Sequence, residues 1–319
     1  MKKLLIVCGM ALLSLGASAQ IKPHVGVGVG IGTTGVAIDA SATITPFLGA
    51  RFGVDIMPNI KVKTDLDLGI EDKTNGYSVS QMTQYIDNLN GQIATWNTTH
   101  PDQALDPIDK SILPNGEIPN RFDIEGKWTN TTWHLLIDVY PFGKVSSFHV
   151  TGGAYFGPSK VVSVYNREEG FMTPINQWNQ AILTAEANPS STLYTMVVQP
   201  NNLSVIGAEL GDYFITPNPA DKGNVEANVK VNGFRPYLGV GFGRAVPKNR
   251  LSCQFDLGVE FWGNPKVYAP TYDKTTKTYL SDTELKEENT GGEAGDVIKF
   301  ITKVSVYPVL NLRLVGRIL

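Results

Sequence analysis

The sequence predicts an all-β fold: an eight-stranded antiparallel up-and-down transmembrane β-barrel with long extracellular loops that contain short helices. Three observations support this prediction. Apolar residues alternate with polar residues or glycine over eight segments, each about ten residues long, which is the length of a tilted strand that crosses a membrane. The N-terminus has the pattern of an exported protein. The rest of the chain holds one cysteine, Cys253, so no intramolecular disulfide can form.

Residues 1–19 have the features of a secretory signal peptide. Two lysines follow the first methionine, an apolar stretch comes next, and Ala17-Ser18-Ala19 provides the small-residue cleavage site. We therefore expect a mature barrel domain that spans residues 20–319. The whole chain has a net charge of −3, and this mild acidity gives no basic footprint for nucleic acid.

The alternating segments are the predicted strands. In the first of them, Val25, Val27 and Val29 share one face, while Gly26 and Gly28 share the other. Glycine is costly in a solvent-exposed strand, but it suits inward faces that crowd a narrow lumen. A secreted β-sandwich would show the same period and is the alternative. In chain order the eight segments are 21–32, 35–45, 48–56, 132–140, 148–157, 234–243, 251–261 and 303–314.

The connections between these segments are very unequal. Three are long, at about 58–125, 160–229 and 263–299. Outer-membrane barrels combine short periplasmic turns with long external loops. With a periplasmic N-terminus all three long loops fall outside, so we expect a protein of the cell outer membrane. The short connections lie around Thr33-Thr34, Pro46, Gly143-Lys144 and Pro247-Lys248-Asn249.

The long loops are acidic and contain helical patterns. The first has 11 acidic and 5 basic residues, the second 7 and 3, and the third 7 and 5. Such a surface is either simply solvated or recruits divalent cations that bridge lipopolysaccharide. Apolar residues recur at helical spacing over 79–96, and a Thr-Pro pair, with Thr173 as the expected N-cap, opens a second pattern over 173–188. We expect these helices to cap the barrel mouth or to dock a partner. The apolar-rich stretch 203–215 leaves open whether the second loop adds further strands.

No metal site and no cofactor are predicted. The acidic residues of the first loop offer oxygen ligands for calcium, but their spacing matches no fixed calcium-binding loop. The residues in question are Asp65, Asp67, Glu71 and Asp72.

Charged residues on the inward faces define a candidate lumen network. Buried charges must be paired, so we expect the three arginines of the set to neutralise Asp55, Asp256 and Glu260. A two-residue turn at Gly143-Lys144 would place Asp138 opposite His149. The candidates are Arg51, Asp55, His134, Asp138, His149, Arg235, Asp256, Glu260 and Arg313.

An aspartate–histidine pair is also the beginning of a catalytic dyad. Outer-membrane barrel hydrolases work near the outer leaflet, whereas His149 is expected at the opposite end. The sequence contains no His-x-Ser. We therefore predict no enzymatic activity and no catalytic residues.

Several segments resemble a known family. They are LLIDVYPFG, FHVTGGAYF, RPYLGVGFG, FDLGVEFWGNPKV and VYPVLNLRL, which cover the last five predicted strands. Together they are similar to bacterial eight-stranded outer-membrane barrels of the porin-like kind, which in outline resemble outer membrane proteins A, W and X. The resemblance implies a barrel that contacts outer-membrane lipid and lipopolysaccharide and is inserted by the outer-membrane assembly machinery. Such barrels usually end in an aromatic residue, whereas this chain ends in Arg317-Ile318-Leu319.

Two functions fit these observations. In the first, the lumen is filled by paired charges, and the large extracellular loops serve a structural or binding role toward a protein or a host-surface ligand. In the second, the barrel is a narrow porin-like channel for small solutes. Lumen-facing glycines such as Gly153, Gly157 and Gly239 leave a gap in that case, unless inward arginine and tyrosine side chains fill it.

Overall fold

The computed structural model describes residues 24–67, 79–110, 121–167, 172–198, 205–217 and 224–319. The predicted signal peptide and half of the acidic cluster considered for calcium, Glu71 and Asp72, lie outside these ranges. Within them, no helix has both the length and the apolar character needed to cross a membrane.

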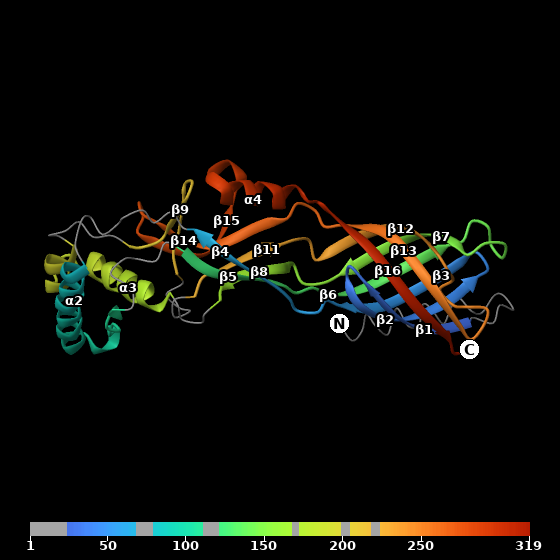
Figure 1. Cartoon of the computed structure of the whole chain (residues 1–319), viewed down its shortest axis with the longest axis horizontal. Helices are drawn as coiled ribbons and strands as arrows, with labels where there is room; N and C mark the ends of the chain where they lie inside the picture. Colours follow the sequence, from blue (N-terminus) through green and yellow to red (C-terminus); the bar gives the residue numbers. More distant parts are fainter. Residues whose placement is uncertain (1–23, 68–78, 111–120, 168–171, 199–204, 218–223) are drawn as a thin grey trace.

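Eight strands close into a barrel, which confirms the predicted fold class (Figure 1). Each strand pairs antiparallel with its neighbours in chain order, and the first pairs with the last, so that Gly28 stands opposite Val315. The barrel strands are β1 (His24–Gly32), β2 (Gly35–Thr45), β3 (Leu48–Ile56), β6 (Thr131–Val139), β7 (Phe148–Phe156), β12 (Phe234–Phe242), β13 (Leu251–Phe261) and β16 (Val306–Arg317).

The two faces of the barrel wall differ as the alternation predicts. Along β1, Val27, Val29 and Ile31 are exposed, while the glycines between them face inward. The same alternation places apolar side chains outward on the other seven strands. An apolar belt around a polar interior is the surface that a membrane-crossing barrel presents to lipid. Its members include Trp133, Leu135, Phe156, Leu238, Val240, Leu257, Leu310 and Leu312.

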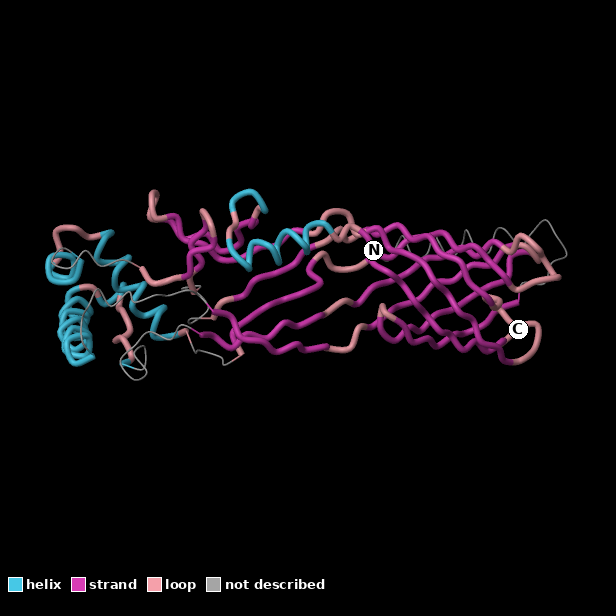
Figure 2. The backbone as a smooth tube through the Cα atoms, turned by 45° about the horizontal axis from the view of Figure 1, so that its top comes forward, coloured by secondary structure: helices cyan, strands magenta, loops and turns pink. Residues whose placement is uncertain are grey.

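The long connections contain strands as well as helices. Five barrel strands continue past the barrel end into a second sheet, here called the extension sheet, which keeps the barrel's order of pairing (Figure 2). Strands that leave a barrel side by side remain close enough to go on pairing. The extension sheet consists of β4 (Ile60–Asp67), β5 (Arg121–Trp128), β8 (Lys160–Asn166), β11 (Glu226–Lys230), β14 (Lys266–Asp273), β10 (Tyr213–Ile215) and β9 (Ala208–Leu210), with β15 (Thr278–Leu285) paired to β14.

Two helices occupy the segments where helical spacing predicts them. They are α2 (Val79–Thr99) and α3 (Thr173–Ala187), and the N-cap of α3 is Met172 instead of the expected Thr173. They do not cap the barrel mouth: they lie at the far end of the extension sheet, away from the barrel (Figure 1). A third helix, α4 (Gly292–Lys303), precedes β16 and was not predicted.

Short helical turns complete the extension. They are η1 (Pro101–Gln103), η4 (Tyr194–Val198) and η6 (Glu287–Asn289).

The extension has its own cores. The tip core joins α2, α3 and the segments beside them; its members include Ile86, Leu89, Ile93, Trp96, Ile175, Trp178, Ile182 and Leu193. A second core lies between the extension sheet and α4 and includes Val161, Val229, Trp262, Val267, Leu285 and Ile298. Burial of apolar surface on this scale makes the extension a folded part of the protein.

Asparagine side chains fasten extended segments to the helices. Asn97 on α2 accepts a hydrogen bond from the backbone N–H of Leu105 and donates one to its carbonyl, both at 2.8 Å. Asn90, two turns earlier, binds Ile108 in the same way at 2.7 and 3.0 Å. On α3, Asn179 does so with Ile206 at 2.6 and 2.8 Å. Each amide replaces the backbone partner that a neighbouring strand would supply.

Candidate functional site

The barrel lumen gathers all nine candidate residues, each buried. They form two groups at different heights. The turn-side network lies toward the barrel end that carries the turns after β2, β6 and β12. It consists of Asp39, Arg51, Asp138, His149, Thr151, Gln254, Asp256 and Arg313. The extension-side network lies toward the extension sheet and consists of Thr34, Asp55, Asn130, His134, Arg235, Glu260 and Trp262.

Arg51 is the centre of the turn-side network. Its guanidinium donates two hydrogen bonds to Asp256, at 2.8 and 3.0 Å, and one to Asp138 at 2.7 Å. Asp138 also accepts a hydrogen bond from Thr151 at 2.7 Å. A fork-shaped guanidinium that binds carboxylates from two other strands ties distant parts of the barrel wall together. Asp256, one of the three carboxylates expected to pair with an arginine, is therefore a partner of Arg51. Asp138 is a second partner, which was not among those expected.

His149 belongs to the same network. Its Nε2 lies 2.9 Å from an Asp256 oxygen and 3.2 Å from the Gln254 amide, and its Nδ1 lies 3.2 Å from the carbonyl of Ser147. The predicted placement of Asp138 directly opposite His149 is wrong, since Asp138 pairs with Thr151. The connection from β6 to β7 is longer than a two-residue turn, which shifts the register.

Arg313 has a partner that the sequence reasoning missed. It binds Asp39 through Nε at 2.6 Å and through a second nitrogen, and it donates to Gln254 at 2.7 Å. None of the three expected carboxylates is its partner. Asp39 stands on the polar face of the second alternating segment, so the same parity that selected the other candidates also marks this residue.

The extension-side network pairs different groups. Asp55 binds His134 and accepts a hydrogen bond from Thr34 at 2.9 Å, so its partner is an imidazole instead of an arginine. Glu260 accepts a hydrogen bond from the Trp262 indole at 3.0 Å.

Arg235 closes the extension-side network. It lies 3.9 Å from Glu260, a long ion pair. Its closer contacts are the Asn130 side chain at 3.1 Å and the carbonyls of Asn232 and Pro158, at 2.8 and 2.7 Å. Arg235 thus anchors the base of the extension to the barrel.

The inward glycines make room for these large side chains. A Cβ built on Gly28 would lie 2.3 Å from Nε of Arg313, and one on Gly241 would lie 2.6 Å from Nε2 of His149. A Cβ on Gly239 would lie 2.4 Å from the Tyr237 hydroxyl. The gap that glycine leaves in a narrow barrel is therefore filled by a neighbour's side chain.

An apolar layer separates the two networks. It consists of Leu136, Tyr155, Tyr237 and Val309, all buried. Leu136 stands on β6 between members of the two networks, and Val309 pairs with Gly258, which lies between Asp256 and Glu260 on β13.

The turn after β12 closes the lumen at the end that lies away from the extension sheet. Ala245 and Val246 of this turn are buried. The Ala245 carbonyl accepts hydrogen bonds from Ser41 at 2.6 Å and Arg313 at 3.2 Å, and its N–H donates to the Tyr140 hydroxyl at 2.7 Å. Beside it, the Arg244 guanidinium lies 4.8 Å from the Tyr140 ring centre. The turn therefore folds inward and seals this end.

Among the described residues, the one cluster with the geometry for a metal ion is Asp138, His149 and Asp256, whose ligand atoms lie within 4.8 Å of one another. The Arg51 guanidinium already bridges the two carboxylates of this cluster. A divalent cation would have to compete with that fixed positive charge, so the arrangement favours an ion-pair network over a metal centre.

A smaller polar cluster lies in the extension sheet. Glu125 on β5 accepts hydrogen bonds from Lys61 on β4, at 2.7 Å, and from the Tyr165 hydroxyl on β8. The hydrogen bond from Lys61, followed by that from Tyr165, lowers the pKa of the Glu125 carboxyl, while the pKa values of Lys61 and Tyr165 are raised by the same contacts. One carboxylate thus links three neighbouring strands.

A closed eight-stranded barrel with an outward apolar belt and a polar, filled lumen defines a β-barrel of the outer-membrane type. Comparison with solved structures finds CarO and CarO2 of Acinetobacter baumannii, each with a TM-score of 0.39. Their identities are 13% and 12%; the matches cover 91% and 92% of this chain and 96% and 98% of theirs.

A major outer membrane protein from Thermus thermophilus is also similar, with a TM-score of 0.34 and 14% identity over 93% of this chain and 100% of that protein. No protein-family model and no curated protein sequence matches this chain.

Proposed function

We propose that this protein is an integral outer-membrane barrel that carries no solute and instead holds a folded binding module at the cell surface. In this proposal the N-terminus is periplasmic, and the extension sheet and helical tip are extracellular. The observation that carries it is the filled lumen. Two buried polar networks, the apolar layer between them and the turn around Ala245 occupy the path that a solute would take.

The extension supports the binding role. It has two cores, and asparagine clamps hold its segments to α2 and α3. Its three parent segments are net acidic, so a cationic surface, or lipopolysaccharide phosphate bridged by divalent cations, is the partner chemistry that its charge favours. A folded protrusion with a net charge is suited to present contacts at a fixed distance from the barrel.

The narrow channel is the second candidate, and the glycine positions weigh against it. The space beside Gly239 and Gly241 is taken by Tyr237 and His149. The aspartate–histidine pair considered as a catalytic dyad gives no support to catalysis, since both ring nitrogens of His149 contact structural partners.

Conductance in a planar bilayer tests the proposal. The refolded mature chain should give no steady ion-selective steps, and a variant with residues 58–125 shortened to a turn should be equally silent. A porin of known conductance, inserted into the same bilayer, serves as the positive control and should conduct. Steps from the unaltered protein would make it a channel, and steps only from the shortened variant would make the extension a lid.

Binding at the extension needs its own measurement. We expect purified protein in detergent to bind lipopolysaccharide in the presence of Ca²⁺, with the binding abolished by a chelator and absent from the shortened variant. Binding that survives both changes would place the contact on the barrel wall or on the part of the extension formed by residues 160–229 and 263–299.

A further inference from the structure

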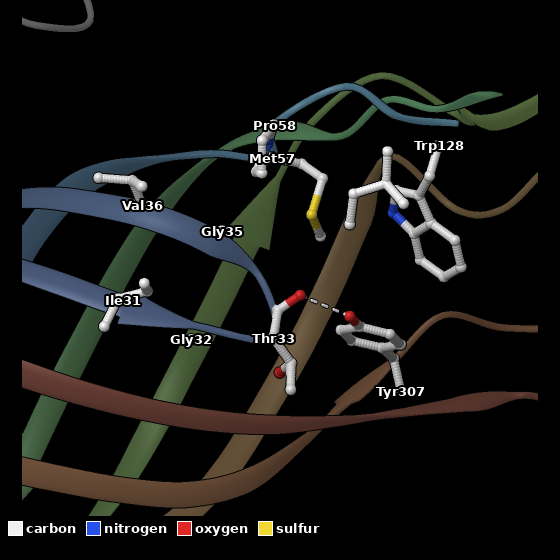
Figure 3. Close-up of a pocket in the computed structure, with 10 residues that line it drawn as sticks. Ile31, Gly32, Thr33, Gly35, Val36, Met57, Pro58, Trp128 and Tyr307 are labelled. Carbon is white, nitrogen blue, oxygen red and sulfur yellow. Dashed lines mark hydrogen bonds between the residues drawn. The ribbon is translucent and has the colours of Figure 1, made fainter. Parts of the chain in front are cut away.

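An apolar groove opens in the outer wall where the barrel meets the extension (Figure 3). Its volume is about 350 Å³, within the range of small-ligand sites. Ile31 and Val36 on its barrel side belong to the lipid-facing belt. The other lining residues that matter here are Thr33, Met57, Trp128 and Tyr307.

The groove exists because one hairpin is short. The connection between β1 and β2 is a tight turn at Thr33-Thr34, whereas β3 on one side continues into β4 and the chain leading into β16 on the other forms α4. The turn is held in place: the Tyr307 hydroxyl donates to the Thr33 carbonyl at 2.6 Å (Figure 3). The Thr33 hydroxyl in turn donates to the Pro308 carbonyl at 3.0 Å. The gap in the wall is therefore a fixed feature of the fold.

Exposed apolar side chains stand on both sides of the groove. On β4, an edge strand of the extension sheet, Ile60 and Val62 are 50% and 63% exposed. On α4, Val297 and Phe300 are 57% and 72% exposed. Apolar surface that continues upward from the lipid-facing belt along both flanks indicates contact with lipid instead of water.

Trp128 adds a polar contact to the groove. Its ring centre lies 5.9 Å from that of Tyr307 and 6.1 Å from that of Trp262. Its indole N–H is buried and has no hydrogen-bond partner in the described part of the chain. A buried indole normally finds an acceptor, and in the surroundings of an apolar groove at a membrane interface an ester carbonyl is such an acceptor.

We propose that this groove binds one ester-linked acyl chain of a membrane lipid in the leaflet at the extension end. The chain would lie against Ile31, Val36 and Met57, with its ester carbonyl accepting from the Trp128 indole. The inference rests on the membrane setting of the proposed function. Continuity of the groove with the lipid-facing belt favours a lipid over a second copy of the protein.

Tryptophan quenching by brominated lipid tests the proposal. The mature protein is placed in bilayers with increasing fractions of a phosphatidylcholine brominated on its acyl chains. The contribution of Trp128 is the signal lost in Trp128→Phe, and that of the lipid-facing Trp133 is the signal lost in Trp133→Phe. Trp128 should be quenched at several-fold lower brominated fraction than Trp133 and should saturate, because a bound chain dwells longer than bulk lipid.

Two matched variants locate the effect. Ile31→Asn places an amide in the groove and should bring the Trp128 curve to that of Trp133. Leu238→Asn, at a similarly exposed belt position on β12, should leave it unchanged. The inference is overturned if Trp128 and Trp133 give the same linear curve, if Ile31→Asn has no effect, or if Trp128 is not quenched while Trp133 is.

A barrel that does not lie in the membrane would give a different quenching result. Loss of quenching at Trp133 itself would contradict the membrane position of the barrel. An unquenched Trp128 together with a cross-linked dimer would assign the groove to a second copy and would also overturn the lipid site.

Discussion

The backbone of Gly28 lies directly beneath the guanidinium of Arg313. A Cβ at Gly28 would stand 2.3 Å from Nε and 2.6 Å from the central carbon of the guanidinium, distances at which atoms cannot coexist. The Arg313–Asp39 pair thus packs directly against the backbone of β1, with no side chain between them. Glycine on an inward face therefore makes room for a large side chain from a neighbouring position of the barrel wall.

Gly28→Ala should destabilise the barrel by about 1–3 kcal/mol, because the added methyl group overpacks the lumen and displaces Arg313 from Asp39. Urea unfolding of the refolded protein in liposomes measures the effect. Gly152→Ala is the matched control, since a Cβ there meets nothing within 4 Å. Equal midpoints for the two variants would contradict a tightly packed lumen.

Arg51→Met should cost about 3–5 kcal/mol, because it leaves the buried carboxylates of Asp138 and Asp256 without their guanidinium. The same unfolding experiment applies. Adding Asp138→Asn and Asp256→Asn to Arg51→Met should recover a large part of the loss, since no buried charge is then left unpaired. An unchanged unfolding midpoint for Arg51→Met would show that the turn-side network does not stabilise the barrel.

The extension should lose stability in acid through Glu125. Its folded pKa is lowered by the hydrogen bonds from Lys61 and Tyr165, so its contribution is complete above the unfolded pKa of about 4.3 and disappears as the pH falls through the lower folded value. Thermal unfolding of the extension should therefore differ between the unaltered protein and Glu125→Gln at neutral pH, and the difference should vanish once the pH has fallen below the lowered folded pKa of Glu125.

The matched control for this pH effect is Asp87→Asn. Asp87 pairs with Lys110 on the surface, where both side chains are 54% exposed, and such pairs contribute little. A pH-independent gap between the unaltered protein and Glu125→Gln would show that lost packing, and not the charge, is responsible.

Asn97→Ala should loosen the segment after α2, because the Leu105 backbone loses both of its hydrogen bonds to the side chain. Amide exchange at Leu105 should become about ten times faster, as expected for roughly 1–2 kcal/mol of lost local stability. Thr95→Ala on the same helix, which removes only an exposed bond to the Gly91 carbonyl, should change nothing at Leu105. Unaltered exchange in Asn97→Ala would show that packing alone holds the segment.

The barrel could be predicted from the sequence because a period of two is a local property. Val27 and Val29 reveal the outward face without knowledge of any neighbour. The same parity identified the buried charges, including Arg51 and Asp256.

The pairing of those charges could not be predicted in the same way. It depends on strand register and barrel stagger, which bring Arg313 to Asp39 from 274 residues away. One longer turn after β6 was enough to move Asp138 from His149 to Thr151.

The extension sheet escaped prediction for a different reason. Its strands β4 and β5 also alternate, with Ile60 and Val62 opposite Lys61 in β4, but each has only 8 residues and lies inside a connection whose length predicts a loop. The pairing that continues from the barrel identifies these segments as strands. The helices were simpler, since the apolar spacing around Ile86 and Ile93 is again local.

The pairing of β1 with β16 gives the barrel a late step in assembly. Contacts between residues far apart in sequence form slowly, and Gly28 meets Val315 only when almost the entire chain has been delivered. Until then Asp39 on β2 lacks Arg313, so a barrel that is still an open sheet holds an unpaired lumen charge. Ring closure and neutralisation of Asp39 are therefore a single event, and a premature ring made from fewer strands would retain the charge that only the final strand removes.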